Sequence, residues 1–199
     1  MIPDKANIIA SLQQDILRLE RFRASNTMEV DTRLGLIRHA FPDHTFPLGA
    51  VHEFLCSHQE DTSATQGFLS GLLSTLMNAS GITVWISASR KLFPPALKHF
   101  NVDPDRFIFI DLKNEKDVIV AMDEALKCAA LTTVVAEVKE ISFTASRRLQ
   151  LAVEESRVTG FVLRNSDKNP TTTACISRWR ITSQPSVTRE DLPGMGYPM

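Results

Sequence analysis

Short apolar runs alternate with longer amphipathic segments along the middle of the chain. Nearly unbroken apolar runs predict buried β-strands over residues 49–56, 81–89, 106–112, 132–138 and 160–165. Helical spacing of apolar residues, or a proline-led start, predicts helices over residues 62–80, 93–101, 114–131 and 143–159. The residues expected to cap three of these helices are Thr62 or Ser63, Asn114, and Thr144 or Ser146. Strands that are apolar on both faces and alternate with helices predict an α/β fold with a mostly parallel sheet flanked by helices.

The two ends of the chain differ from this regular middle. An amphipathic N-terminal helix is predicted over residues 4–22, because its apolar residues recur at helical spacing, at Ile8, Leu12, Ile16, Leu19 and Phe22. Such a stripe covers an apolar surface, either on its own domain or on a partner. Prolines and turn formers follow and predict a loop with one short helix near Leu34–Ala40. We therefore divide the chain into an N-terminal helix and linker, residues 1–45, and a core domain, residues 46–199.

The C-terminal part of the core domain has a weaker pattern. Residues 171–186 alternate polar and apolar, which predicts a final antiparallel or edge strand. Residues 189–199 carry two prolines and two glycines, so we expect a loosely ordered tail.

Composition narrows the class of protein. The chain has 199 residues, of which 43% are hydrophobic and 23% charged, as expected for one soluble globular domain. The net charge of −1 gives no overall basic field to attract nucleic acid. The cysteines Cys56, Cys128 and Cys175 are far apart and form no CxxC pair, so we expect reduced thiols. The sequence shows neither a signal peptide nor an apolar run of membrane-spanning length, which predicts a cytoplasmic protein.

The stretch EFLCSHQEDTSATQGFLSGLL, residues 53–73, lies where many α/β proteins bind the phosphates of a nucleotide. A phosphate loop requires GxxxxGK[ST], because its glycines turn backbone N–H groups inward and its lysine neutralises the phosphates. In this chain the corresponding, degenerate positions are Cys56, Ser63, Ala64 and Thr65. Only Thr65 keeps the required residue type, and Glu60 and Asp61 place negative charge where phosphates would lie. The sequence therefore predicts a phosphate loop that has lost its chemistry.

Other catalytic signals are equally weak. Glu137, at the end of the apolar run VVAEV, is a Walker-B-like acid of the kind that orients magnesium. The second carboxylate that positions water in such enzymes is missing from VWISASRKL. The five histidines show no HExxH spacing and no paired metal pattern, and no GxSxG is present. We therefore expect no ATPase activity, no metal site and no cofactor.

Three stretches of the chain are specific enough to suggest a family: EALKCAAL at 124–131, SRRLQLA at 146–152 and SRWRI at 177–181. They resemble the ImuA family, whose members are RecA-like, and the resemblance extends from Phe46 to Tyr197. It implies a RecA-like, P-loop-type core with a degenerate Walker A loop. Members of this family continue past LPGMGYP into a further strand pair, which raises the hypothesis that this sequence is truncated at its C-terminus.

The resemblance also implies a function. ImuA proteins belong to the DNA-damage or SOS response, and they act in error-prone translesion synthesis with ImuB, a relative of Y-family polymerases. We therefore expect a non-catalytic accessory protein that contacts an ImuB-like protein, and RecA as a further partner, with DNA reached indirectly. The alternatives are a division inhibitor that binds FtsZ like the distant relative SulA, a divergent ATPase that uses Thr65 and Glu137, and a DNA-binding module.

Five arginines are the candidate contacts for a partner or for DNA phosphates: Arg147, Arg148, Arg164, Arg178 and Arg180. Arg147 and Arg148 stand in the first turns of a predicted helix, where cations oppose the helix dipole. Pairing with acids such as Glu140 or Glu137 is the alternative reading of these two. Arg178 and Arg180 share one face of a predicted strand and either bind a partner or protect a sheet edge. Arg164 precedes Asn165, which falls where RecA-like enzymes carry a sensor amide.

Overall fold

The computed structural model describes residues 32–77, 80–166, 169–184, 186–189 and 192–198. The predicted helix over residues 4–22 therefore lies outside the described residues. From Thr32 onward the chain forms one compact unit, and the predicted domain boundary at residue 46 stays a prediction. None of the described helices is long and apolar enough to cross a membrane.

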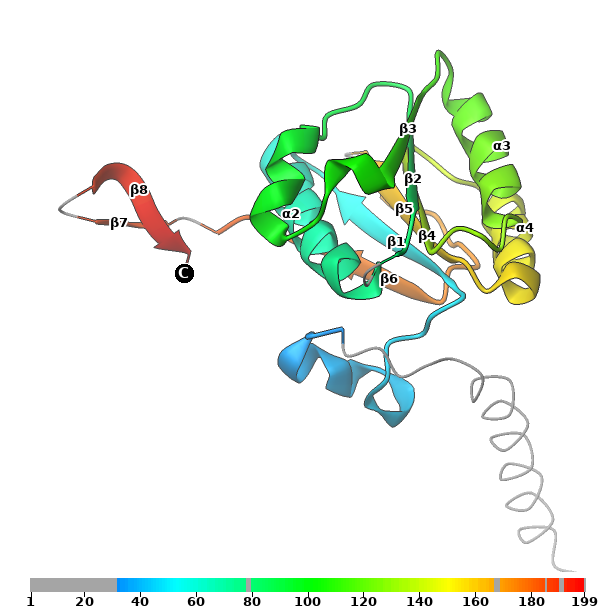
Figure 1. The fold of residues 1–199 in the computed structure, drawn as a ribbon, viewed down its shortest axis with the longest axis horizontal. Helices are drawn as coiled ribbons and strands as arrows, with labels where there is room; N and C mark the ends of the chain where they lie inside the picture. Colours follow the sequence, from blue (N-terminus) through cyan, green and yellow to red (C-terminus); the bar gives the residue numbers. More distant parts are fainter. Residues whose placement is uncertain (1–31, 78–79, 167–168, 185, 190–191, 199) are drawn as a thin grey trace, which may run out of the picture. The chain divides into compact units, whose positions relative to one another are not determined.

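Six parallel strands form the central sheet (Figure 1). The strands are β1 (Val51–Cys56), β2 (Thr83–Ser87), β3 (Phe107–Asp111), β4 (Thr133–Val138), β5 (Thr159–Asn165) and β6 (Ser177–Arg180). Their order across the sheet is β3-β2-β4-β5-β1-β6, and every pairing is parallel. The predicted α/β class is confirmed. The final strand β6 lies at the sheet edge as expected, but it pairs parallel to β1, so the antiparallel alternative is wrong.

Helices cover both faces of this sheet. The helix α2 (Gln59–Leu76) packs on one face, and α3 (Glu115–Leu126) and α4 (Phe143–Ser156) pack on the other (Figure 1). The main core cluster lies under α3 and α4, where Met122, Leu126 and Leu149 meet alternate residues of the strands. Gly160 on β5 allows this close approach, because a Cβ there would lie 3.2 Å from the Met122 side chain.

Two helix starts differ from the sequence prediction. The helix α2 begins at Gln59 rather than Thr62, with His58 at the N-cap, because Glu60 and Asp61 suit the positive end of the helix dipole. In α4 the N-cap is Ser142, whose Oγ accepts a hydrogen bond from the Ala145 backbone at 3.1 Å. The expected caps Thr62, Ser63, Thr144 and Ser146 are all inside helices. Asn114 holds the predicted N-cap position of α3.

The remaining elements are short. Four 3-10 helices occupy Gly35–Ala40 (η1), Pro42–His44 (η2), Pro94–Phe100 (η3) and Pro104–Arg106 (η4) among the described residues. The first of them confirms the short helix predicted near Leu34–Ala40. The tail forms an antiparallel hairpin of β7 (Ser186–Arg189) and β8 (Leu192–Pro198), where the sequence predicted loose order.

Candidate functional site

The connection between β1 and α2 consists of two residues, Ser57 and His58. A phosphate loop wraps a phosphate with the backbone N–H groups of several loop residues. Here the chain passes directly from the strand into the helix, so Ser63, Ala64 and Thr65 lie inside α2 and not in a loop. Their backbone N–H groups belong to the helical hydrogen-bond pattern beyond its first turn. These positions, which the sequence assigned to a phosphate loop, therefore lie in a helix that follows β1, and they form no loop.

The two hydroxyl residues of this set have different surroundings. Thr65 is fully buried, and its Oγ1 accepts a contact of 3.4 Å from the Cys56 thiol at the end of β1. Burial raises the pKa of the Cys56 thiol. Ser63 is exposed and donates to the Gln59 carbonyl oxygen one turn earlier, at 3.2 Å. Both hydroxyls are therefore used locally.

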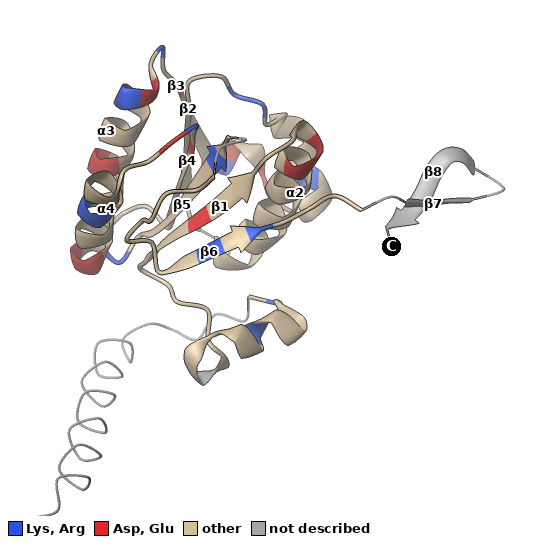
Figure 2. Cartoon of the chain, turned by 180° about the vertical axis from the view of Figure 1, so that it is seen from behind, with Lys and Arg blue, Asp and Glu red and all other residues tan. Residues whose placement is uncertain are grey.

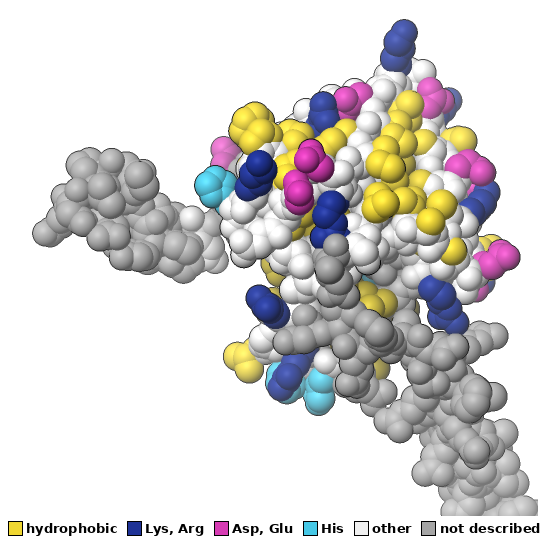
Figure 3. Space-filling model, in the orientation of Figure 1, with side chains coloured by type: hydrophobic (Ala, Val, Ile, Leu, Met, Phe, Trp, Pro, Cys, Tyr) yellow, Lys and Arg dark blue, Asp and Glu magenta, His cyan; other side chains and the backbone are white. Residues whose placement is uncertain are grey.

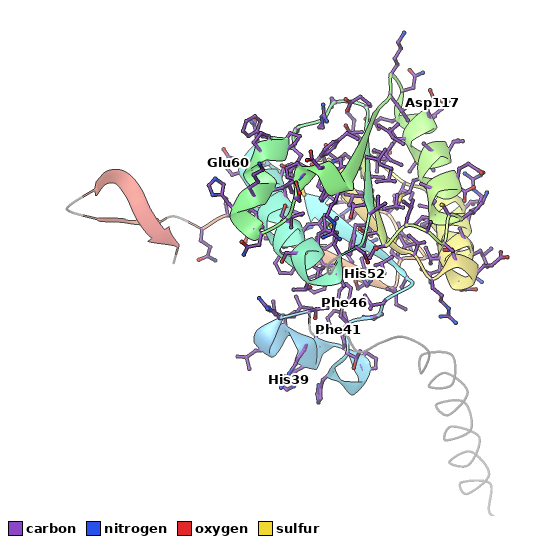
Figure 4. All side chains as sticks on the ribbon, viewed as in Figure 1. His39, Phe41, Phe46, His52, Glu60 and Asp117 are labelled. Atoms are coloured by element: carbon purple, nitrogen blue, oxygen red, sulfur yellow. The ribbon has the colours of Figure 1, made fainter. Side chains whose placement is uncertain are left out.

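A carboxylate of the protein itself occupies the start of α2. Asp61 is buried in the first helical turn, and its Oδ1 accepts a hydrogen bond of 3.1 Å from the backbone N–H of Ser183. Glu60, labelled in Figure 4, is beside it and exposed. The N-terminus of a helix favours a negative charge, which in a phosphate-binding protein comes from the bound anion. Here the two carboxylates supply that negative charge.

Glu137 is held inside the layer between the sheet and α2. Its Oε1 accepts a hydrogen bond of 2.8 Å from Trp85 Nε1 on β2 and a weaker one of 3.4 Å from Gln66 Nε2 on α2. The side chain is only 5% exposed, and burial is the main cause that raises its pKa. Asn165, at the position expected for a sensor amide, accepts a hydrogen bond of 3.0 Å from Thr62 Oγ1 through its Oδ1.

The other face of β1 carries a buried ionic network. Glu53 is fully buried, and its Oε1 accepts a hydrogen bond of 2.6 Å from Arg164 Nη1 on β5. Its Oε2 accepts one of 2.6 Å from Arg178 Nε on β6 and one of 2.9 Å from Thr173 Oγ1. Arg178 also donates to the Thr171 carbonyl oxygen at 2.6 Å, so it ties the chain between β5 and β6 to the sheet. Figure 2 shows this arrangement as an acidic position on β1 beside basic positions on β6.

The structure thus separates the five candidate arginines. Arg164 and Arg178 share Glu53, and Arg148 lies 3.4 Å from Asp123 on α3. Among the residues that the structure describes, Arg147 and Arg180 have no hydrogen bond and no ion pair, and both are exposed. The predicted alternative of pairing with a nearby acid is therefore confirmed for Arg148, although its partner is Asp123 and not Glu140 or Glu137. Arg147 has no such partner among the described residues.

Glu53 is the residue that sequence reasoning missed. The signal was a single carboxylate within VHEFLC, a run otherwise suited to a buried strand. Because charged side chains are almost never fully buried without a partner, that residue already predicted an arginine or lysine nearby.

Comparison with known proteins identifies relatives. No protein-family model matches the chain. Two curated proteins, both called Protein ImuA, come from two strains of Caulobacter vibrioides. Each is 31% identical to this chain over an alignment of 170 positions, which covers 79% of this chain and 70% of the relative.

Two solved structures are also similar. SulA from Pseudomonas aeruginosa matches with a TM-score of 0.48 and 19% identity, over 59% of this chain and 98% of that one. The RadB recombinase matches with a TM-score of 0.45 and 12% identity, over 61% and 63%. The sequence relatives confirm the resemblance drawn from the motifs at 124–131, 146–152 and 177–181. The chain therefore belongs to the ImuA family.

Proposed function

We propose that this chain is a non-catalytic accessory protein of the DNA-damage response, acting in error-prone translesion synthesis through protein–protein contacts. Membership of the ImuA family supports the assignment to translesion synthesis in the DNA-damage response. The observation that carries the non-catalytic part is the two-residue connection between β1 and α2, because it leaves no loop to enclose phosphates.

Three further features of the same region support this reading. Asp61 and Glu60 place negative charge at the helix start, where the γ-phosphate of a nucleotide would be repelled. The Thr65 hydroxyl faces the Cys56 thiol. The Glu137 carboxylate is buried beneath Trp85 and Gln66, and its raised pKa disfavours the charged form that a metal ligand requires.

The partners proposed are an ImuB-like relative of Y-family polymerases and, in addition, RecA. Exposed apolar side chains over β3 and α3 support a role in protein contact (Figure 3). Ile108 on the edge strand β3 and Val120 on α3 each expose at least half of their surface. Apolar groups exposed on a sheet edge favour association with another protein.

The test is complementation of a strain that lacks the gene, with damage-induced mutagenesis as the readout. The wild-type gene is expected to restore mutagenesis, and so are Thr65→Ala and Glu137→Gln, because neither residue acts on a nucleotide. Ile108→Lys is expected to abolish both mutagenesis and capture of the ImuB-like protein encoded in the same genome. Leu151→Lys is the matched control, since Leu151 is equally half-exposed but lies on α4.

Three outcomes would contradict the proposal. Unchanged mutagenesis on deletion would remove the link to lesion bypass. Loss of function in Glu137→Gln, together with ATP binding by the purified protein, would favour the divergent ATPase. Inhibition of FtsZ GTPase activity by the purified protein would instead indicate a function in the control of cell division.

A further inference from the structure

A small polar hollow lies at the carboxyl ends of β1, β5 and β6. It is lined by Leu55, Ser57, Arg164, Ser166, Pro170 and Arg180. Leu55 pairs in register with Arg164 on one side and with Arg180 on the other. Side chains of residues paired in this way point to the same face of a parallel sheet, so two arginines flank one leucine. The carboxyl ends of parallel strands are also where ligands of such sheets bind.

This hollow is separate from the β1–α2 junction. Leu55 follows Val51 and Glu53 in the alternation of β1, and Val51 belongs to the core cluster under α3 and α4. The hollow therefore opens on the face opposite to α2, and the degenerate loop positions do not contribute to it.

One buried hydrogen-bond donor of Arg164 and the whole guanidinium group of Arg180 have no partner among the described residues. Arg164 is only 3% exposed, and it gives Nη1 to Glu53, but its Nε–H is buried with no acceptor among the described residues. Arg180 has no hydrogen bond or ion pair with any residue that the structure describes. None of the described residues that line the hollow is acidic. Since a buried donor without an acceptor is costly, an acceptor atom at this place would stabilise the folded protein.

We propose that the hollow binds a phosphate-type oxyanion, with one oxygen seated at Arg164 and the others held by Arg180 at the opening. The enclosed space has room for about one water molecule, which admits one oxygen and not a whole phosphate group. A group with several terminal oxygens reaches both arginines, and guanidinium groups bind phosphate oxygens through charge-assisted hydrogen bonds. The Ser57 hydroxyl lines the same space and adds a further donor. This site does not depend on the proposed role in lesion bypass.

The experiment titrates the full chain with inorganic phosphate at constant ionic strength, with binding followed by calorimetry and by NMR of arginine side-chain Nε–H groups. Saturable binding that shifts one buried Nε–H resonance is expected for the wild type. Arg180→Ala is expected to weaken binding by about tenfold or more, the typical effect of losing a charge-assisted hydrogen bond. Arg147→Ala is the matched control, because Arg147 is also exposed and unpaired among the described residues but lies on α4. Its binding should equal that of the wild type.

Two further arms identify the source of the oxyanion. A short single-stranded oligonucleotide replaces inorganic phosphate in one arm, and Arg180-dependent binding there assigns the site to a phosphodiester. Arg180-dependent binding of inorganic phosphate alone assigns it to a free phosphate or a monoester. Acetate is the third titrant, and acetate binding as tight as phosphate binding would overturn the phosphate assignment in favour of a carboxylate. The absence of saturable binding by either phosphate probe, or an equal loss in Arg147→Ala and Arg180→Ala, would overturn the site itself.

Discussion

Trp85 donates a hydrogen bond from its indole nitrogen to Glu137 across 2.8 Å, between neighbouring strands of the sheet. This contact joins an acid near the end of β4 to a fully buried aromatic side chain on β2. It explains how a carboxylate is tolerated in this layer, because each buried polar group needs a partner. It also makes Glu137 part of the fold, and several properties of the folded protein follow from this contact and its neighbours.

Glu137→Gln is expected to change how stability depends on pH. Burial raises the pKa of Glu137 above 4.5, so the folded protein holds this proton more firmly than the unfolded chain does. The resulting stabilisation is fully present below the unfolded pKa and is lost as the pH rises through the folded pKa. The free energy of unfolding of the wild type, relative to Glu137→Gln, should therefore fall as the pH rises from 4.5 through the raised folded-state pKa.

Urea unfolding of both proteins across this range is the measurement. Glu154→Gln is the control, because Glu154 is exposed on α4. A constant difference in unfolding free energy at every pH would show that Glu137 titrates alike in the folded and unfolded states.

Glu53→Gln is expected to destabilise the protein strongly. The amide cannot balance the charge of Arg164, which is almost fully buried, and breaking a buried ion pair costs about 3–5 kcal/mol. Arg178→Ala should cost less, because the Arg178 side chain is 38% exposed and Glu53 keeps Arg164 as a partner. Chemical denaturation gives both values, and a loss for Glu53→Gln as small as that of the surface variant Glu154→Gln would contradict the network.

His52 is expected to make the protein sensitive to acid. It stacks on Phe46, 4.3 Å between ring centroids, and both residues are labelled in Figure 4. Nε2 donates to the Pro47 carbonyl oxygen at 2.8 Å, and Nδ1 lies 2.7 Å from Ser177 Oγ, a hydroxyl that can donate to a neutral ring. Burial lowers the pKa of His52 from 6.5 to about 4.

The unfolded chain therefore takes up this proton more readily than the folded protein. Stability is lost as the pH falls from the unfolded value of 6.5 towards about 4, and the loss reaches about 3 kcal/mol. In His52→Gln, which keeps a donor and an acceptor but does not titrate, this part of the pH dependence should vanish. His99→Gln, at an exposed position, should leave the pH dependence as in the wild type, and equal profiles for all three proteins would argue against this assignment.

The three cysteines are expected to react at very different rates with a thiol reagent. Cys128 is exposed, Cys56 is buried, and burial raises the pKa of Cys175 to about 11. At about pH 8 the thiolate fraction of Cys175 is on the order of one in a thousand, so it reacts slowly. With a chromogenic thiol reagent, the native protein should show a fast phase of one equivalent of thiol, and this phase should be absent from Cys128→Ser. A fast equivalent that survives in Cys128→Ser would show that one of the other two thiols is accessible.

The sequence by itself determined the class of fold and the absence of a phosphate-loop motif from residues 53–73. Apolar runs separated by amphipathic segments permit little else than a parallel sheet between helices, because each run has to be covered on both faces. Residues 53–66 contain no glycine and no lysine, so the residue types that a phosphate loop requires are missing whatever fold the chain adopts.

Only the tertiary structure decided which arginines are committed and which remain unpaired. Arg164 and Arg178 are 111 and 125 residues from Glu53, and they meet it because β5 and β6 flank β1 in register. Local pattern carries no information on strand order, so it cannot distinguish Arg178, bound to Glu53, from Arg180 two residues later. The same holds for the hydrogen bond from the Ser183 backbone to Asp61 in the first turn of α2, which the order of residues does not reveal.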